Sequence, residues 1–220
     1  MNIQENLNHI KSTLPDHVTL VAVSKTKPVS DLMEAYNTGQ RIFGENKIQE
    51  MAEKYETMPK DIQWHMIGHV QRNKVKYMAS FVSLIHGVEN FKLLQEIDKQ
   101  AKKHDRIVDC LLQIKIASED SKFGMSPDDA SDILQSENFS ALKNIRITGV
   151  MGMATFTENK EQIEKEFNLL KSTFQDLKIL KPELDTISMG MSGDYKLAID
   201  CGSTMVRVGS SIFGERNYTN

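Results

Sequence analysis

Short hydrophobic runs alternate along this chain with longer stretches in which hydrophobic residues recur every three to four positions. The short runs are rich in β-branched residues, which is typical of buried strands, whereas the longer spacing is typical of helices that cover a core. Eight runs are predicted to be strands: 18–24, 41–44, 63–68, 81–87, 107–116, 145–153, 184–191 and 204–210. The stretches between them are predicted to be helices: 30–38, 46–56, 71–79, 89–104, 128–136, 159–177 and 193–200.

This alternation predicts the fold class. Strands that are connected through helices must run parallel, and parallel sheets are covered by helices on both faces. Eight such units close into a (β/α)8 TIM barrel, so we expect residues 1–220 to form a single α/β domain with an extra N-terminal helix over residues 2–13. A doubly wound open sheet of six to eight strands is the alternative. No linker, low-complexity tract or charge block in the sequence indicates a second domain.

Composition and charge restrict the class of function. Hydrophobic residues make up 40% of the 220 positions and charged residues 26%, which is ordinary for a globular protein. The net charge of −3 does not favour nucleic acid as a partner. No hydrophobic run approaches the roughly 20 residues that cross a bilayer, and residues 1–16 lack the apolar core of a secretory signal. The two cysteines, Cys110 and Cys201, suit a reducing compartment, so we expect a cytoplasmic protein without a membrane partner.

The first candidate for chemistry is a lysine at the end of the first predicted strand. Functional residues of such a barrel lie where the strands end, and Lys25 follows a strand that is hydrophobic on both faces. Desolvation lowers the pKa of a lysine, and the neutral amine can then form a Schiff base with an aldehyde. The alternative for Lys25 is a surface lysine with its ammonium in water. Lys27 is expected to face the solvent.

Glycines and serines follow the seventh and eighth predicted strands. The segments are GMSGD at 190–194, which contains Ser192, and VGSS at 208–211, which contains Gly209 and Ser210. The first segment places a serine at the start of a predicted helix, where free N–H groups favour phosphate. The second offers Gly209 for a close approach of the backbone, with hydroxyl groups at Ser210 and Ser211, and phosphate sites recur at this place in the fold. Ordinary glycine turns with helix-capping serines are the alternative.

Three further side chains could contribute to a site or to the core. Arg207 lies in the last strand, and we expect it either to point into the barrel mouth or to pair with a carboxylate such as Glu45 or Asp200, because an unpaired buried charge is costly. His86, at the end of the fourth predicted strand, either contacts a ligand or is a structural histidine. His65 and His69 lack a third ligand, so no metal site is expected.

Seven motifs taken together resemble a known family, and they fall in the family's order. They are VAVSKTKP, FGENKIQE, WHMIGHVQRNK, KFGM, GVMGMAT, SMGMSGDY and GSTMVRVGSSIFGER. The chain resembles the pyridoxal phosphate homeostasis proteins over about residues 3–217, and the barrel of these proteins is related to the N-terminal domain of alanine racemase.

The resemblance implies a single-domain barrel that carries pyridoxal 5′-phosphate (PLP). The cofactor contacts that it implies are Lys25 for the covalent Schiff base, Asn46 near the ring hydroxyl, Arg207 near the pyridine nitrogen, and Ser192, Gly209 and Ser210 at the phosphate, with Met191 and His86 placed near the pocket. An arginine does not give up its proton, so a ring nitrogen that faces it stays unprotonated and the ring is a poorer electron sink.

These implications favour a protein that holds PLP in order to buffer or deliver it. We expect a monomer with no catalytic residue, and PLP-dependent apo-enzymes are its candidate partners. Racemases of this fold carry a second, β-rich domain, for which the sequence shows no equivalent, and Tyr195 or His86 are the candidates for a second acid or base. The alternatives are a PLP-dependent amino-acid racemase or lyase, a PLP-responsive interaction protein and a Schiff-base aldolase. His69 and Glu89 depart from the family pattern in the third and fourth loops, which leaves partner specificity open.

Overall fold

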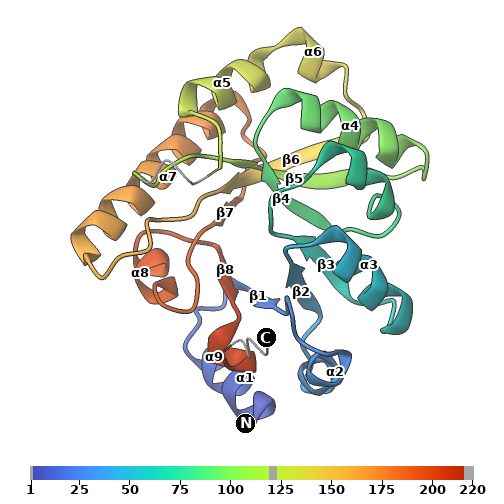
Figure 1. The fold of residues 1–220 in the computed structure, drawn as a ribbon. Coiled ribbons are helices and arrows are strands. Elements are labelled where there is room, and N and C mark those ends of the chain that lie inside the picture. The colour runs from blue at the N-terminus through green and yellow to red at the C-terminus, as the bar shows by residue number, and fades with distance from the viewer. Residues whose placement is uncertain (1, 119–122, 216–220) are drawn as a thin grey trace.

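Eight parallel strands close into a barrel in the computed structural model, which describes residues 2–118 and 123–215. The order around the barrel follows the chain, and the helices lie outside the ring of strands (Figure 1). This arrangement confirms the predicted TIM barrel. The strands are β1 (Thr19–Val23), β2 (Ile42–Glu45), β3 (Gln63–Met66), β4 (Leu84–Val88), β5 (Val108–Gln113), β6 (Ile145–Met151), β7 (Thr186–Ser188) and β8 (Met205–Val208).

The helices lie in the predicted stretches, except that one stretch forms a 3-10 helix and two short helices were not predicted. The helices are α1 (Ile3–Ser12), α2 (Val29–Asn37), α3 (Ile48–Thr57), α4 (Phe91–Lys102), α5 (Pro127–Gln135), α6 (Glu137–Ser140), α7 (Lys160–Leu180), α8 (Tyr195–Asp200) and α9 (Ser210–Phe213). The stretch predicted over 71–79 is instead a 3-10 helix, η1 (Arg72–Tyr77), which buries Val75. The four-residue helices α6 and α9 are too short to produce a hydrophobic period, so the pattern did not predict them.

Closure of the barrel brings the first and last strands together. β1 pairs with β8 over four positions, from Thr19 opposite Met205 to Ala22 opposite Val208. Alternate residues of a strand point to opposite faces, so Val21 of β1 and Arg207 of β8, which are partners in this register, share a face. Val21 belongs to a small hydrophobic cluster with Leu84, Leu111, Met151 and Met205, which lies inside the barrel. The larger core lies between the strands and the surrounding helices.

The N-terminal helix packs on the outside of the barrel. α1 buries Ile3, Leu7 and Ile10 and contacts α2 and α9. The side-chain amide of Asn6 donates to the carbonyl oxygen of Ile212 at 3.1 Å, which ties the two ends of the chain together. In the described parts of the chain, no helix combines the length and hydrophobicity needed to span a bilayer.

The tightest backbone approach in the barrel generates a stability prediction. Gly149 of β6 pairs with Thr186 of β7, and a Cβ at position 149 would lie 1.8 Å from the carbonyl oxygen of Thr186. Backbone cannot rotate away as a side chain can, so we expect Gly149→Ala to lower the free energy of unfolding by about 3 kcal/mol or more. Gly193→Ala is the control because an added Cβ there meets nothing within 4 Å. Equal urea midpoints for the two variants would contradict this packing.

Candidate functional site

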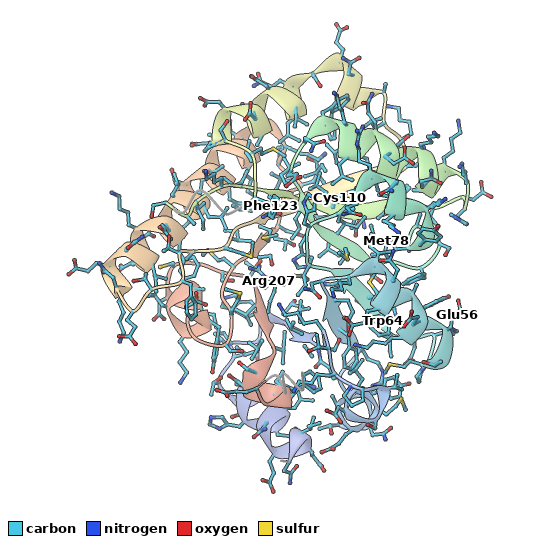
Figure 2. All side chains as sticks on the ribbon, viewed as in Figure 1. Glu56, Trp64, Met78, Cys110, Phe123 and Arg207 are labelled. Carbon is cyan, nitrogen blue, oxygen red and sulfur yellow. The ribbon has the colours of Figure 1, made fainter. Side chains whose placement is uncertain are left out.

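A cavity of about 550 Å³ opens at the carboxyl ends of the strands. In a parallel barrel these ends meet at one mouth, so residues from distant parts of the sequence converge there. Residues predicted from the sequence that line the cavity are Lys25, Asn46, Met191, Ser192, Arg207, Gly209 and Ser210. His86 is not among the lining residues. Figure 2 shows Arg207 within the ring of strands.

Two lysines of the segment after β1 reach the cavity. Lys25 and Lys27 are both partly buried and both line it, so the expectation that Lys27 faces the solvent is wrong. The Nζ of Lys27 donates hydrogen bonds to the carbonyl oxygens of Phe213 at 2.8 Å and Glu215 at 2.9 Å. Lys27 therefore ties this segment to the end of α9, and Lys25 is the better candidate for a nucleophile.

The two segments that the sequence predicted for phosphate lie side by side. The N–H of Gly209 donates to Oγ of Ser192 at 3.2 Å, and a Cβ at Gly209 would lie only 3.0 Å from the carbonyl oxygen of Val23. α8 begins directly after the first segment, and α9 begins at Ser210, within the second. The N–H of Tyr195, the first residue of α8, donates to the carbonyl oxygen of Met191 at 2.8 Å, whereas the N–H groups of Ser210 and Ser211 have no acceptor within α9. This corner of the cavity therefore offers hydroxyl and N–H donors to an anion.

Arg207 is a buried cation whose polar contacts are uncharged. It is 4% exposed, and its guanidinium donates to Oγ of Ser188 at 2.6 Å and to the carbonyl oxygen of Gly152 at 3.1 Å. Within the described residues it forms no ion pair, and Glu45, a partner suggested by the sequence, pairs with Lys54 instead. Burial lowers the pKa of Arg207 to about 10, against the opposing charge of Asp194, so the side chain stays charged at neutral pH.

Two buried histidines extend this contact into the barrel interior. Oγ of Ser188 lies 3.0 Å from Nδ1 of His86, and Nε2 of His86 lies 3.1 Å from Nδ1 of His65. Burial lowers the pKa of His65 to about 3 and that of His86 well below its usual value, with the charges of His65 and Arg207 adding to the effect on His86. His86 therefore lies beneath the cavity, where it is neutral and supports Arg207 through Ser188. The resemblance placed His86 near the pocket, but it does not line the cavity.

The hydrogen-bond network assigns the protons of this chain. Ser188 Oγ accepts from Arg207, so its own proton is available to Nδ1 of His86. His86 then carries its proton on Nε2 and donates to Nδ1 of His65. The hydrogen bonds thus run in one direction, from Arg207 to Ser188, from Ser188 to His86 and from His86 to His65. They orient the guanidinium of Arg207 without adding a second charge. Sequence reasoning missed Ser188 because a serine inside a strand carries no local signal.

A second feature missed by sequence reasoning lies at the rim. His69 lines the cavity, its Nδ1 is 3.3 Å from Oε1 of Glu89, and its ring stacks on Phe123 with centroids 4.5 Å apart. His69 follows β3 and Glu89 follows β4, so the adjacency of these parallel strands was the signal that could have paired them. Lys122 of the KFGM motif lies outside the described residues. Among the residues described, no group of three or more His, Cys, Asp or Glu is placed to bind a metal ion.

Sequence comparisons relate the whole chain to proteins of one kind. The family model of the alanine racemase N-terminal domain matches residues 1–217. The chain is similar to the pyridoxal phosphate homeostasis protein of Vibrio alginolyticus, with 36% identity over 99% of both proteins. It is also similar to the protein of the same name from Aquifex aeolicus, with 37% identity over 90% of this chain and 87% of that protein.

Solved structures share this fold, with different sequence identity and different coverage of their own chains. PipY of Synechococcus elongatus PCC7942, determined without PLP, matches 96% of this chain and 100% of its own with a TM-score of 0.91 and 34% identity. PipY with PLP bound matches over the same shares, with a TM-score of 0.88 and 33% identity. An alanine racemase of Clostridium difficile 630 covers 99% of this chain with a TM-score of 0.80, but the match spans 57% of the racemase and its 17% identity supports the fold alone.

The buried histidines predict how stability depends on pH. The folded protein keeps His65 neutral down to about pH 3, whereas a histidine in an unfolded chain binds a proton below about pH 6.5. The unfolded state therefore gains protons that the folded state does not, and the free energy of unfolding should fall by about 1.4 kcal/mol per pH unit for each buried histidine as the pH drops below 6.5.

Urea unfolding of the wild type and of His65→Gln between pH 7 and pH 5 measures this slope, which should be shallower in the variant. His17→Gln, at an exposed histidine, should keep the slope of the wild type. A wild-type stability that stays constant over this range would contradict neutral burial.

Proposed function

The chain belongs to the alanine racemase N-terminal domain family and, within it, to the pyridoxal phosphate homeostasis proteins, and we propose that it holds PLP in the cavity at the barrel mouth. Its role in this proposal is to buffer or deliver the cofactor. The observation that carries the proposal is the convergence of a lysine amine, a buried guanidinium and two donor-rich segments on one cavity.

The chemistry of the lining residues fits PLP. The cavity has the size of a small-molecule site, for which 300 to about 1,000 Å³ is usual. Oδ1 of Asn46 is buried without a hydrogen-bond partner among the described residues, which leaves an acceptor for the ring hydroxyl. Lys25 would hold the aldehyde carbon covalently, Arg207 would face the ring nitrogen, and the phosphate would lie against Ser192, Gly209 and Ser210, with Met191 beside the ring.

The residues of the chain restrict what the bound cofactor does. When bound, PLP supplies an aldehyde that condenses with a primary amine and a ring that can delocalise negative charge. The guanidinium of Arg207 keeps its own proton while it donates a hydrogen bond, so it leaves the ring nitrogen unprotonated. Ser188 and His86, both uncharged, hold the guanidinium in place. This arrangement retains the cofactor without strengthening its capacity to accept electrons.

Tyr195 and His86, the two candidates that the sequence offers for a second acid or base, do not line the cavity, which supports a carrier. The hydroxyl of Tyr195 is 3.2 Å from Oγ1 of Thr13 on the segment after α1, and His86 lies below the site. Neither could move a proton on the far side of a bound ring. The proposal extends to a single domain over residues 1–220 that acts as a cytoplasmic monomer and supplies PLP-dependent apo-enzymes. The buried, unbridged Cys110 and Cys201 are consistent with a reducing compartment.

Reduction with borohydride tests the attachment site. In protein incubated with PLP, we expect reduction followed by peptide mapping to find the cofactor on Lys25, because this residue lines the cavity and the ammonium of Lys27, which also lines it, binds the carbonyl oxygens of Phe213 and Glu215. Lys25→Ala should lose the covalent label and keep its unfolding midpoint. Lys27→Ala is the matched control and should retain the label. A label on Lys27 in the wild type would contradict the assignment.

A racemase or lyase is the second candidate function, and the rim favours it in one respect. His69 paired with Glu89 is an imidazole–carboxylate pair on the cavity wall, the type of group that moves protons. If the chain is a carrier, PLP-loaded protein should convert L-alanine and other amino acids no faster than Lys25→Ala does. Turnover that falls about 100-fold or more in His69→Phe would instead establish the enzyme.

A further inference from the structure

Lys25 lies in a four-residue turn with an unusual backbone conformation. The N–H of Lys27 donates to the carbonyl oxygen of Ser24 at 3.1 Å, which closes the turn over residues 24–27. Thr26, the third residue of the turn, has a φ of 64°. This left-handed conformation normally favours glycine or asparagine, and a β-branched residue adopts it only where the surroundings hold it. The turn that carries the proposed attachment amine therefore needs external anchors.

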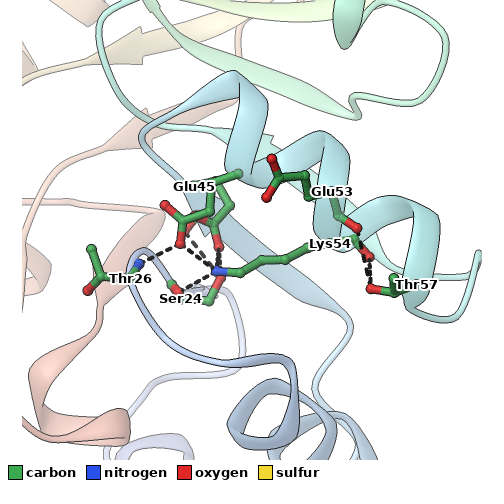
Figure 3. Close-up of polar contacts among 8 residues, drawn as sticks. Ser24, Thr26, Glu45, Glu53, Lys54 and Thr57 are labelled. Carbon is green, nitrogen blue, oxygen red and sulfur yellow. Dashed lines mark hydrogen bonds and ion pairs between the residues drawn. The ribbon is translucent and has the colours of Figure 1, made fainter.

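A charged cluster from β2 and α3 supplies these anchors. Nζ of Lys54 donates to the carbonyl oxygen of Ser24 at 2.9 Å and to Oε1 of Glu45 at 2.7 Å (Figure 3). It also donates to Oε1 of Glu50 at 2.8 Å. Oε1 of Glu50 also accepts the N–H of Thr26 at 2.6 Å, and Oε1 of Glu45 accepts the hydroxyl of Ser24 at 2.6 Å. Both chain neighbours of Lys25 are thus bound to one cluster.

The burial of this cluster is expensive and calls for a reason. Lys54 is 6% exposed and Glu45 is fully buried. All three protons of the ammonium are used in hydrogen bonds, which is the condition for burying it. Burial raises the pKa of Glu45, against the charge and hydrogen bond of Lys54 and the hydrogen bond of Ser24. Buried ion pairs often contribute less stability than hydrophobic packing, so stability alone does not explain a cluster placed around this turn.

We propose that Glu50 and Lys54 are positioning residues, which hold the turn so that the amine of Lys25 meets the aldehyde in the cavity. Neither residue lines the cavity. The inference rests on the proposed attachment of PLP at Lys25. In that step the neutral amine forms a carbon–nitrogen double bond to the aldehyde carbon, and the aldehyde oxygen leaves as water with the two amine protons. Holding the amine in place raises the rate of this step because the entropy of orientation is lost in folding.

The rate of condensation with PLP, followed by absorbance after rapid mixing, tests the proposal. We expect Glu50→Ala to slow condensation about tenfold, because the N–H of Thr26 and the ammonium of Lys54 both lose a partner. Glu50→Gln should stay within about threefold of the wild type, since its amide oxygen can still accept from Thr26. If Glu50→Gln were as slow as Glu50→Ala, the claim that the hydrogen bond between Glu50 and the N–H of Thr26 anchors the turn would be wrong.

Glu53→Ala is the matched control. It removes the same charge from the same helix. Glu53 is exposed, and its carboxylate has no hydrogen bond or ion pair within residues 2–118 and 123–215; its backbone carbonyl accepts from the hydroxyl of Thr57 (Figure 3). Its rate should stay within about twofold of the wild type. Unfolding midpoints of all variants separate slower condensation from loss of fold. A Glu50→Ala rate within twofold of the wild type, or equal slowing in both alanine variants, would overturn the positioning role.

The wild type offers a test that does not depend on any variant folding. The N–H of Thr26 belongs to an exposed residue, yet its hydrogen bond to Glu50 should protect it from hydrogen exchange. Exchange as fast as in an unstructured peptide would refute the anchor.

Failure of the proposed function is distinguishable from failure of the positioning role, because then borohydride would leave no label on Lys25 of the wild type. Labelled wild type with an unaffected Glu50→Ala refutes the positioning role alone.

Discussion

Pairing of the first strand with the last is the constraint on which the site depends. β1 and β8 are separated by most of the sequence, yet their register sets Val21 opposite Arg207 and Ala22 opposite Val208. Because the strands are parallel, this register fixes the heights of the segments that follow them. Lys25 and Gly209 therefore border the same cavity. An open sheet with the same strands would leave them at opposite edges and would form no such cavity.

Two buried networks of charged and polar groups adjoin the cavity: the first includes the lining residue Arg207, and the second lies behind the lining residue Lys25. One runs from Arg207 through Ser188 to the neutral histidines beneath the cavity, and the other joins Lys54 to the carboxylates beside the turn of Lys25. In both, a buried cationic side chain donates to oriented acceptors, which is the arrangement that makes its burial tolerable. A cavity built in this way offers fixed positive charge and a placed amine, which suits retention of an anionic aldehyde.

The barrel could be predicted because each strand and helix has its own local pattern, and a series of eight such units has few ways to close. Residues after the strands, such as Lys25 and Ser192, could be placed at the mouth for the same reason. His86 was predicted at the end of its strand, either near the ligand or as a structural histidine; β4 continues to Val88, so the histidine lies within the strand and is fully buried, as in the second alternative. Lys54 binds the carbonyl oxygen of Ser24, 30 residues away, and Ser188 contacts Arg207 and His86 on other strands, and no local pattern contains these pairs.

A crystal structure of the protein grown with PLP tests the central claim most directly. The account predicts electron density that is continuous from Nζ of Lys25 to the cofactor, the phosphate against Ser192 and Gly209, and the guanidinium of Arg207 facing the ring nitrogen. Density for PLP elsewhere, or the amine of Lys25 turned to bulk water above an empty cavity, would contradict it.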